Sequence, residues 1–180
     1  MASARDNCIS CGNFVPRDQG VAFGDGGITD LACFVDGNRS TDAAHPVSVP
    51  ATQKLLGVHL LIVDDAASTI DLLRTALEYC GAFVTTAENA IEGEAILREV
   101  RPHVLVSDIA MPNNGLEMVR HIMSFAAKTG FVIPAVAISA DWDRRNHLRE
   151  AGFSAFFPKP LDPFVLAEVV ARLSRERRRS

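Results

Sequence analysis

Carboxylate, hydroxyl and ammonium side chains follow four of the short apolar runs in this 180-residue sequence. In chain order these residues are Asp64, Asp65, Asp108, Ser139 and Lys159. Carboxylates that lie close together repel one another unless a cation lies among them, and an oxygen-rich cluster suits Mg²⁺. A carboxylate beside the metal can act as a nucleophile toward a phosphoryl group, while an ammonium neutralises the charge that develops.

The elements that must position these residues are predicted by an alternation of apolar runs and longer amphipathic stretches from residue 58 onward. The expected strands are 58–63, 82–86, 103–106, 132–138 and 153–157. In the first amphipathic stretch, apolar residues recur at helical spacing from Ile70 to Cys80, with Ser68 as the expected N-cap and Gly81 just past the end.

Five strand-then-helix units predict the α/β class, with a doubly wound, five-stranded parallel sheet and helices on both faces. The carboxyl ends of parallel strands meet at one edge, which is where ligands bind in open α/β sheets. We therefore expect the two carboxylates after the first strand to meet Asp108, Ser139 and Lys159 at that edge.

The same ordered residues, in this strand context, resemble the receiver domain of two-component response regulators over about residues 58–175. The resemblance implies a flavodoxin-like fold and identifies Asp108 as the phosphoacceptor of an aspartyl phosphate. It implies a Mg²⁺ site formed by Asp64, Asp65, Asp108 and the backbone carbonyl of Ala110. The implied donor is a sensor histidine kinase or a histidine phosphotransfer protein.

The resemblance also implies a switch. Ser139 and Lys159 match the phosphate-sensing hydroxyl and lysine, and Phe156 matches the switch aromatic three residues before that lysine. The implied output surface is the face of the fourth helix, fifth strand and fifth helix, through which we expect a homodimer or an unidentified downstream protein to bind. Gly115 lies seven residues after Asp108, where the family commonly has a glycine at eight, so the intervening loop is expected to be shorter.

The first 50 residues contain three of the four cysteines. The spacing C-x₂-C-x₁₈-D-x₂-C is similar to half of a LIM or treble-clef zinc module, so we expect Zn²⁺ as a second metal. The expected ligands are Cys8, Cys11, Asp30 and Cys33, with Asp36 and His45 as alternatives for the fourth position. A redox-active cysteine pair and a site that has lost its metal stay open as alternatives.

The expected domain organisation has a zinc-knuckle-like module at 1–36, a linker at 37–54 and the receiver at 55–180. Within the module, alternation around Asp25 and Gly26 predicts a hairpin over residues 20–29. The fourth cysteine, Cys80, lies on the apolar face of the first helix and is expected to be a small buried side chain.

Composition excludes several other classes of protein. The sequence is 48% hydrophobic with a formal net charge of −4, which argues against a disordered chain and against a nucleic-acid-binding surface. No apolar run approaches the ~20 residues of a membrane span, and no secretory signal is evident, so we expect a cytoplasmic protein. With 21 residues after Lys159, we expect no C-terminal DNA-binding domain.

We expect a signalling phosphoacceptor rather than a metabolic enzyme. One alternative is an adaptor that binds partners independently of phosphorylation, through the zinc module and a degenerate receiver. A second is a haloacid-dehalogenase-like phosphatase with an aspartate nucleophile. That family needs D-x-D after the first strand, whereas Asp64 and Asp65 are adjacent.

Overall fold

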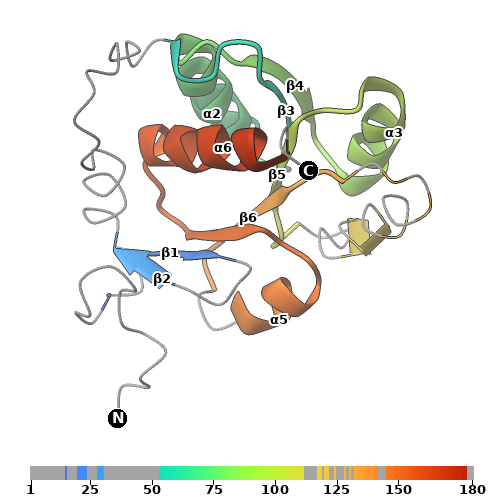
Figure 1. The fold of residues 1–180 in the computed structure, drawn as a ribbon. Helices are drawn as coiled ribbons and strands as arrows, with labels where there is room; N and C mark the ends of the chain where they lie inside the picture. The colour runs from blue at the N-terminus through green and yellow to red at the C-terminus, as the bar shows by residue number, and fades with distance from the viewer. Residues whose placement is uncertain are drawn as a thin grey trace.

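Among the described elements, three strands come first, and from residue 59 onward helices separate most of the strands (Figure 1). The computed structural model describes residues 15, 20–23, 28–30, 53–111, 117, 118, 120, 121, 124, 128, 130, 132–141 and 145–177. The strands are β1 (Gly20–Phe23), β2 (Ile28–Asp30), β3 (His59–Val63), β4 (Phe83–Ala87), β5 (Val104–Asp108), β6 (Ala135–Ser139) and β7 (Ala155–Pro158). The helices are α2 (Ala67–Tyr79), α3 (Ala90–Val100), α5 (Arg145–Glu150) and α6 (Pro163–Arg177).

The five strands from β3 to β7 form the predicted parallel sheet. Their order in space is β7-β6-β5-β3-β4, so β3 lies between β4 and β5. Each strand overlaps the run predicted for it, with ends that differ by up to three residues. All residues of the central strands β5 and β6 are buried, because helices cover both faces of the sheet.

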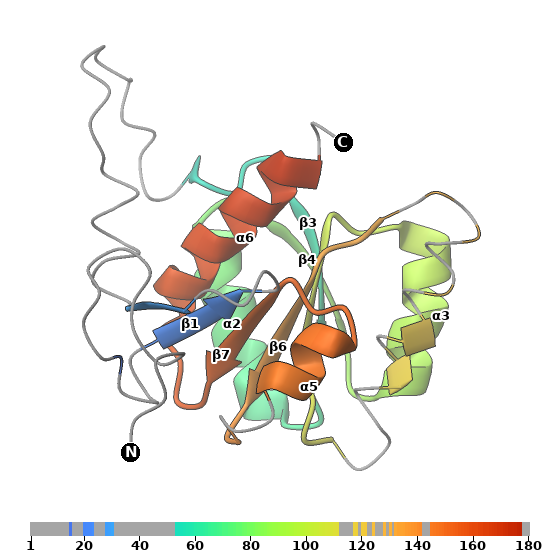
Figure 2. The same cartoon turned by 60° about the horizontal axis from the view of Figure 1, so that its bottom comes forward.

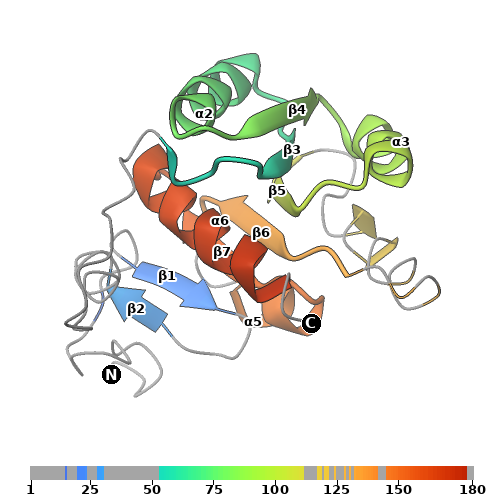
Figure 3. The same cartoon turned by 45° about the horizontal axis from the view of Figure 1, so that its top comes forward.

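Two further strands extend the sheet beyond the expected five. Strand β1 pairs antiparallel with β2, as the predicted hairpin requires, and its other edge pairs antiparallel with β7. The result is one seven-stranded sheet in the order β2-β1-β7-β6-β5-β3-β4, with the hairpin at the end opposite β4 (Figure 3). The five parallel strands were predicted, but the total of seven was not, because a hairpin signal is local and carries no information on long-range pairing.

The core divides into two apolar layers, one on each face of the sheet. Helices α2 and α6 cover one face, and α3 and α5 lie on the other side (Figure 2). The hairpin contributes to both layers, because successive residues of a strand point to opposite faces. Val21 and Phe23 pack in the layer of α2 and α6, whereas Ala22 packs in the layer of α3 and α5. Strand β1 is therefore part of the core.

The helix ends agree only in part with prediction. Helix α2 begins after Ala66, which makes no side-chain cap, so the expectation that Ser68 is the N-cap was wrong. Its C-terminal end is as predicted, with Cys80 buried and with Gly81 at a φ of 90°, where glycine is unstrained. At helix α3, the Asn89 side chain accepts the Glu92 N–H at 2.9 Å and so caps the first turn.

The predicted zinc ligands lie almost entirely outside the described residues. Cys8, Cys11, Cys33, Asp36 and His45 are all outside, and of Asp30 the structure describes the backbone, as the last residue of β2. The zinc site therefore stays a prediction. Among the described residues, no helix is both long and apolar enough to cross a membrane.

Candidate functional site

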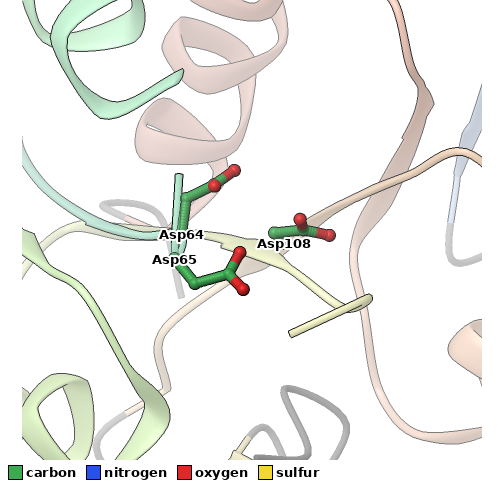
Figure 4. A group of neighbouring side chains, drawn as sticks. All are labelled: Asp64, Asp65 and Asp108. Carbon is green, nitrogen blue, oxygen red and sulfur yellow. The ribbon is translucent and has the colours of Figure 1, made fainter. Parts of the chain in front are cut away.

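Three carboxylates meet at the carboxyl ends of β3 and β5, as expected from the sequence. Asp64 and Asp65 directly follow β3, and Asp108 is the last residue of β5. Because Val63 pairs with Ser107 in the register of these two strands, the acidic residues come next to one another. One carboxylate oxygen from each residue lies within 4.8 Å of the others (Figure 4). The cluster thus presents oxygen ligands of the kind that hard divalent cations prefer.

The fourth charged group of the site is the Lys159 ammonium, directly after β7. Its Nζ lies 2.7 Å from Oδ2 of Asp108 and 3.3 Å from Oδ2 of Asp64. The backbone N–H of Lys159 donates to the carbonyl of Ser139 at 2.9 Å, which ties the ends of β6 and β7 together. Three carboxylates and one ammonium leave two negative charges uncompensated, so the local charge favours an additional cation.

Each buried carboxylate also accepts a backbone hydrogen bond. Oδ1 of Asp64 accepts the N–H of Ala66, and Oδ1 of Asp108 accepts the N–H of Ala110, both at 2.8 Å. Sequence reasoning missed these two donors. An aspartate side chain often accepts the backbone N–H two residues later in a turn. An aspartate at the end of a predicted strand is therefore the sequence signal that could have identified these donors. These bonds fix the carboxylate planes and leave each Oδ2 facing Lys159.

Burial sets the electrostatics of the cluster. Asp64 is 1% exposed and Asp108 is 5% exposed. Burial raises the pKa of Asp64 above its ordinary value, although the Ala66 N–H and the Lys159 ammonium act in the opposite direction. Burial alone would lower the pKa of Lys159, but its hydrogen bond to Asp108 and the charges of both carboxylates outweigh burial, so that pKa is raised. Lys159 therefore stays protonated here. Its single positive charge does not balance the three carboxylates of the site.

Of the remaining predicted residues, Ser139 and Phe156 are described and buried. Ser139 ends β6, is 2% exposed, and its Oγ accepts the backbone N–H of Asp141 at 3.0 Å. Phe156 lies within β7, is 3% exposed, packs in the apolar layer of α3 and α5, and its backbone pairs in register with Ala22 of β1. Gly115 lies outside the described residues, so the predicted shorter loop stays a prediction.

The close packing behind the acidic cluster depends on a glycine that sequence reasoning did not single out. Gly93 of α3 approaches β3 so closely that a Cβ there would lie 2.8 Å from Cγ2 of Val63, the residue before Asp64. A glycine inside an amphipathic helix is the signal that could have identified this contact.

Comparisons with known proteins identify relatives of the part of the chain that forms the parallel sheet. The model of the response regulator receiver domain family matches residues 60–171. An uncharacterised 14.6 kDa protein from Leptolyngbya boryana is 40% identical over 122 residues, which is 66% of this chain and 91% of that protein. Response regulator MprA of Mycobacterium ulcerans is 32% identical over 128 residues, which is 69% of this chain. The match spans 52% of that MprA, so this chain covers about half the length of the MprA relatives.

Solved structures show the same fold. The chemotaxis response regulator CheY4 of Vibrio cholerae superposes with a TM-score of 0.57 at 25% identity, covering 64% of this chain and 98% of CheY4. The receiver domain of a signal transduction histidine kinase from Syntrophus aciditrophicus superposes with a TM-score of 0.61 at 28% identity, covering 69% of this chain and 95% of that domain. The matched family model, the curated relatives and the shared α/β architecture lead to one conclusion: through residues 60–171, this chain belongs to the response regulator receiver domain family of two-component signalling.

Proposed function

We propose that the chain is a phosphoacceptor that receives a phosphoryl group on Asp108 from a phosphohistidine of a sensor kinase or phosphotransfer protein. The observation that carries this proposal is the Lys159 ammonium, which contacts Asp108 and Asp64 at the strand ends while Asp65 completes the carboxylate cluster. Asp108 is held by the Ala110 N–H and faces the ammonium, so its carboxylate is oriented before any donor arrives.

The transfer step needs no proton from the receiver. A carboxylate oxygen of Asp108 bonds to phosphorus while the bond from phosphorus to the donor's imidazole nitrogen breaks, and the electron pair of that bond returns to the ring. Lys159 stabilises negative charge on the transferred oxygens, and the Ser139 hydroxyl can donate its proton as a hydrogen bond to one of them. The product is an acyl phosphate on Asp108.

Magnesium is the cation that the donor set suits. The carboxylates of Asp64, Asp65 and Asp108, with the backbone carbonyl of Ala110, would hold it, because these are hard oxygen ligands around a site with net negative charge. Mg²⁺, when bound, neutralises charge on the phosphoryl oxygens. We propose that the stable product is a signal and that the chain does not turn over phosphate esters as a metabolic enzyme.

Native mass spectrometry of the full chain with Mg²⁺ and acetyl phosphate tests this function. We expect a single phosphoryl adduct on the wild type and none on Asp108→Asn, which keeps the side-chain shape but removes the nucleophile. The matched control is Asp162→Asn. Asp162 is an exposed carboxylate four residues after the end of β7, and its Oδ1 accepts the Phe164 N–H, a role that asparagine preserves. That control should label like the wild type.

Three results would contradict the proposal. An adduct that persists in Asp108→Asn would move the acceptor to another residue. Absence of any adduct on the wild type would favour the alternative of an adaptor that works without phosphorylation. A steady release of phosphate from phosphate esters, measured on the same samples, would instead support the phosphatase alternative.

A further inference from the structure

Strand β1 lies on the outer edge of the strand that leads to the phosphoacceptor site. It pairs with β7 through Ala22 with Phe156 and Phe23 with Ala155. These two β7 residues precede Lys159 by three and four positions, a distance of about 10–13 Å at the rise of a strand. The family match begins at residue 60, so β1 and β2 lie outside it and are an addition to the receiver in this chain.

The pairing between β1 and β7 is short compared with the other pairings of the sheet. Among the described residues, two pairs join β1 to β7, whereas four join β6 to β7 and five join β3 to β4. The Phe23 ring adds a contact with the guanidinium of Arg172 on α6, at 4.6 Å from the ring centroid. Such a cation–π contact contributes modestly at a partly exposed site. If β7 shifts, its pairing with β1 should therefore open before its pairing with β6.

A phosphoryl group on Asp108 would disturb the end of β7. The Lys159 Nζ lies 2.7 Å from Oδ2 of Asp108, which is hydrogen-bond distance and leaves no room for a phosphorus with its oxygens between them. The ammonium must therefore move when that oxygen is phosphorylated. Lys159 directly follows Pro158, the last residue of β7, so the part of this movement that its backbone takes up would act on the strand that β1 pairs with.

We propose that strand β1 is a phosphorylation-controlled cover over the outer edge of β7, paired while Lys159 bridges Asp64 and Asp108 and loosened once Asp108 is phosphorylated. This inference rests on the proposed function. Opening of β1 exposes the backbone edge of β7 and the part of α6 around Arg172. Strand β7 and helix α6 are the fifth strand and fifth helix of the receiver, so the newly exposed surface lies on the output face that the family resemblance implies. Strand β1 occupies this surface in the unphosphorylated chain.

Amide hydrogen exchange of the full chain tests the coupling. Peptic peptides that contain β1 are compared after incubation with Mg²⁺ and acetyl phosphate, and with Mg²⁺ and acetate as the control. Strand β4, at the edge of the sheet opposite the hairpin, is the internal reference. We expect β1 to exchange about fivefold faster or more in the phosphorylated sample, the lower end of typical coupling between two sites, with β4 unchanged. In Asp108→Asn, acetyl phosphate should leave β1 unchanged.

Intact mass, measured on the same samples, separates the two hypotheses. An adduct with unchanged β1 exchange would overturn the cover and leave the phosphoacceptor function standing. Equal acceleration of β1 and β4 would also overturn it, because it would mean general loosening. Absence of an adduct would overturn the proposed function and the cover together.

A variant pair tests one contact that helps to hold the cover closed, in addition to the burial of Val21, Ala22 and Phe23. Arg172→Gln removes the cation over Phe23, whereas Arg175→Gln removes an equal charge from an exposed position on the same helix. Without any phosphodonor, β1 should exchange faster in Arg172→Gln than in Arg175→Gln. Equal exchange in the two variants would contradict the role assigned to the contact between Phe23 and Arg172.

Discussion

Helix α3 approaches β3 so closely at Gly93 that the effect of an added Cβ on stability depends on one neighbouring side chain, Val63. A Cβ at Gly93 would lie 2.8 Å from Cγ2 of Val63 and 3.2 Å from Sδ of Met118. The methionine is unbranched and can move away. Val63 cannot move so easily, because it is fully buried within β3 and its χ1 is restricted by branching at Cβ. The substitution Gly93→Ala therefore overpacks this contact.

Two opposing effects set the size of the change in stability. Alanine stabilises a helix interior by about 1 kcal/mol relative to glycine. Overpacking a well-packed core costs about 1–3 kcal/mol. The net effect of Gly93→Ala should be destabilisation by about 1 kcal/mol, within a range of about 0–2. With a urea m-value of about 2 kcal/mol/M, the midpoint of unfolding should fall by about 0.5 M.

A double-mutant cycle with Val63→Ala isolates the clash. Val63→Ala removes Cγ2 and costs about 1.5 kcal/mol or more, from lost burial of two carbons and the cavity that remains. In that background the remaining close neighbour of the new Cβ at position 93 is the Met118 side chain, which can move away, so Gly93→Ala should stabilise by about 1 kcal/mol. The measurement is urea unfolding followed by circular dichroism for the wild type, both single variants and the double variant, with unchanged m-values as the check on two-state behaviour.

The decisive result is whether Gly93→Ala destabilises the wild type and stabilises Val63→Ala. If Gly93→Ala stabilised the wild type as much as it stabilises Val63→Ala, the close approach of α3 to β3 would not limit packing. The same contact bears on function, because Asp64 directly follows Val63. Displacement of Val63 by Gly93→Ala should therefore also weaken binding of Mg²⁺ to the acidic cluster.

Two further predictions concern a backbone conformation and a buried histidine. Arg101 caps the C-terminal end of α3 with a φ of 51°, a conformation that costs a residue with a side chain about 1–2 kcal/mol. Arg101→Gly should therefore stabilise the fold by about 0.5–1 kcal/mol in urea unfolding. A loss of stability in this variant would contradict the prediction. His59 is partly buried with Nε2 2.8 Å from Oγ1 of Thr85, and burial lowers its pKa below the ordinary 6.5. The unfolded chain then binds more protons than the folded one, so the free energy of unfolding should decrease as pH falls below 6.5. In urea titrations at several pH values, His59→Gln should show a smaller dependence of this free energy on pH. An identical slope in the variant would assign the pH dependence to another group.

Periodicity was sufficient to predict the parallel part of the fold. Buried parallel strands read as continuous apolar runs, and helices read as apolar residues at every third or fourth position, so both are visible without a structure. Helix ends were less predictable. Ser68 has the side chain of an N-cap, yet α2 begins one residue before it, because a cap depends on the backbone path that leads into the helix.

The acidic cluster could be predicted because the topology of a parallel sheet brings strand ends together whatever the loops do. Asp64, Asp65, Asp108 and Lys159 were identified because they follow apolar runs within two residues. The three-dimensional structure places the three carboxylates within 4.8 Å of one another and the Lys159 ammonium in contact with Asp108 and Asp64. The lysine's particular partners, and the backbone N–H groups of Ala66 and Ala110, required coordinates, because such contacts depend on side-chain orientation.

The sequence by itself determined the order of strands and helices, the residues at the strand ends and the hairpin of β1 and β2, since all of these follow from local pattern. Tertiary structure alone decided where that hairpin goes. Its pairing with β7 joins residues more than 130 positions apart, and no local pattern encodes such a contact. It is decided by the free backbone groups at the edge of β7 and by the two apolar layers that Val21, Ala22 and Phe23 complete.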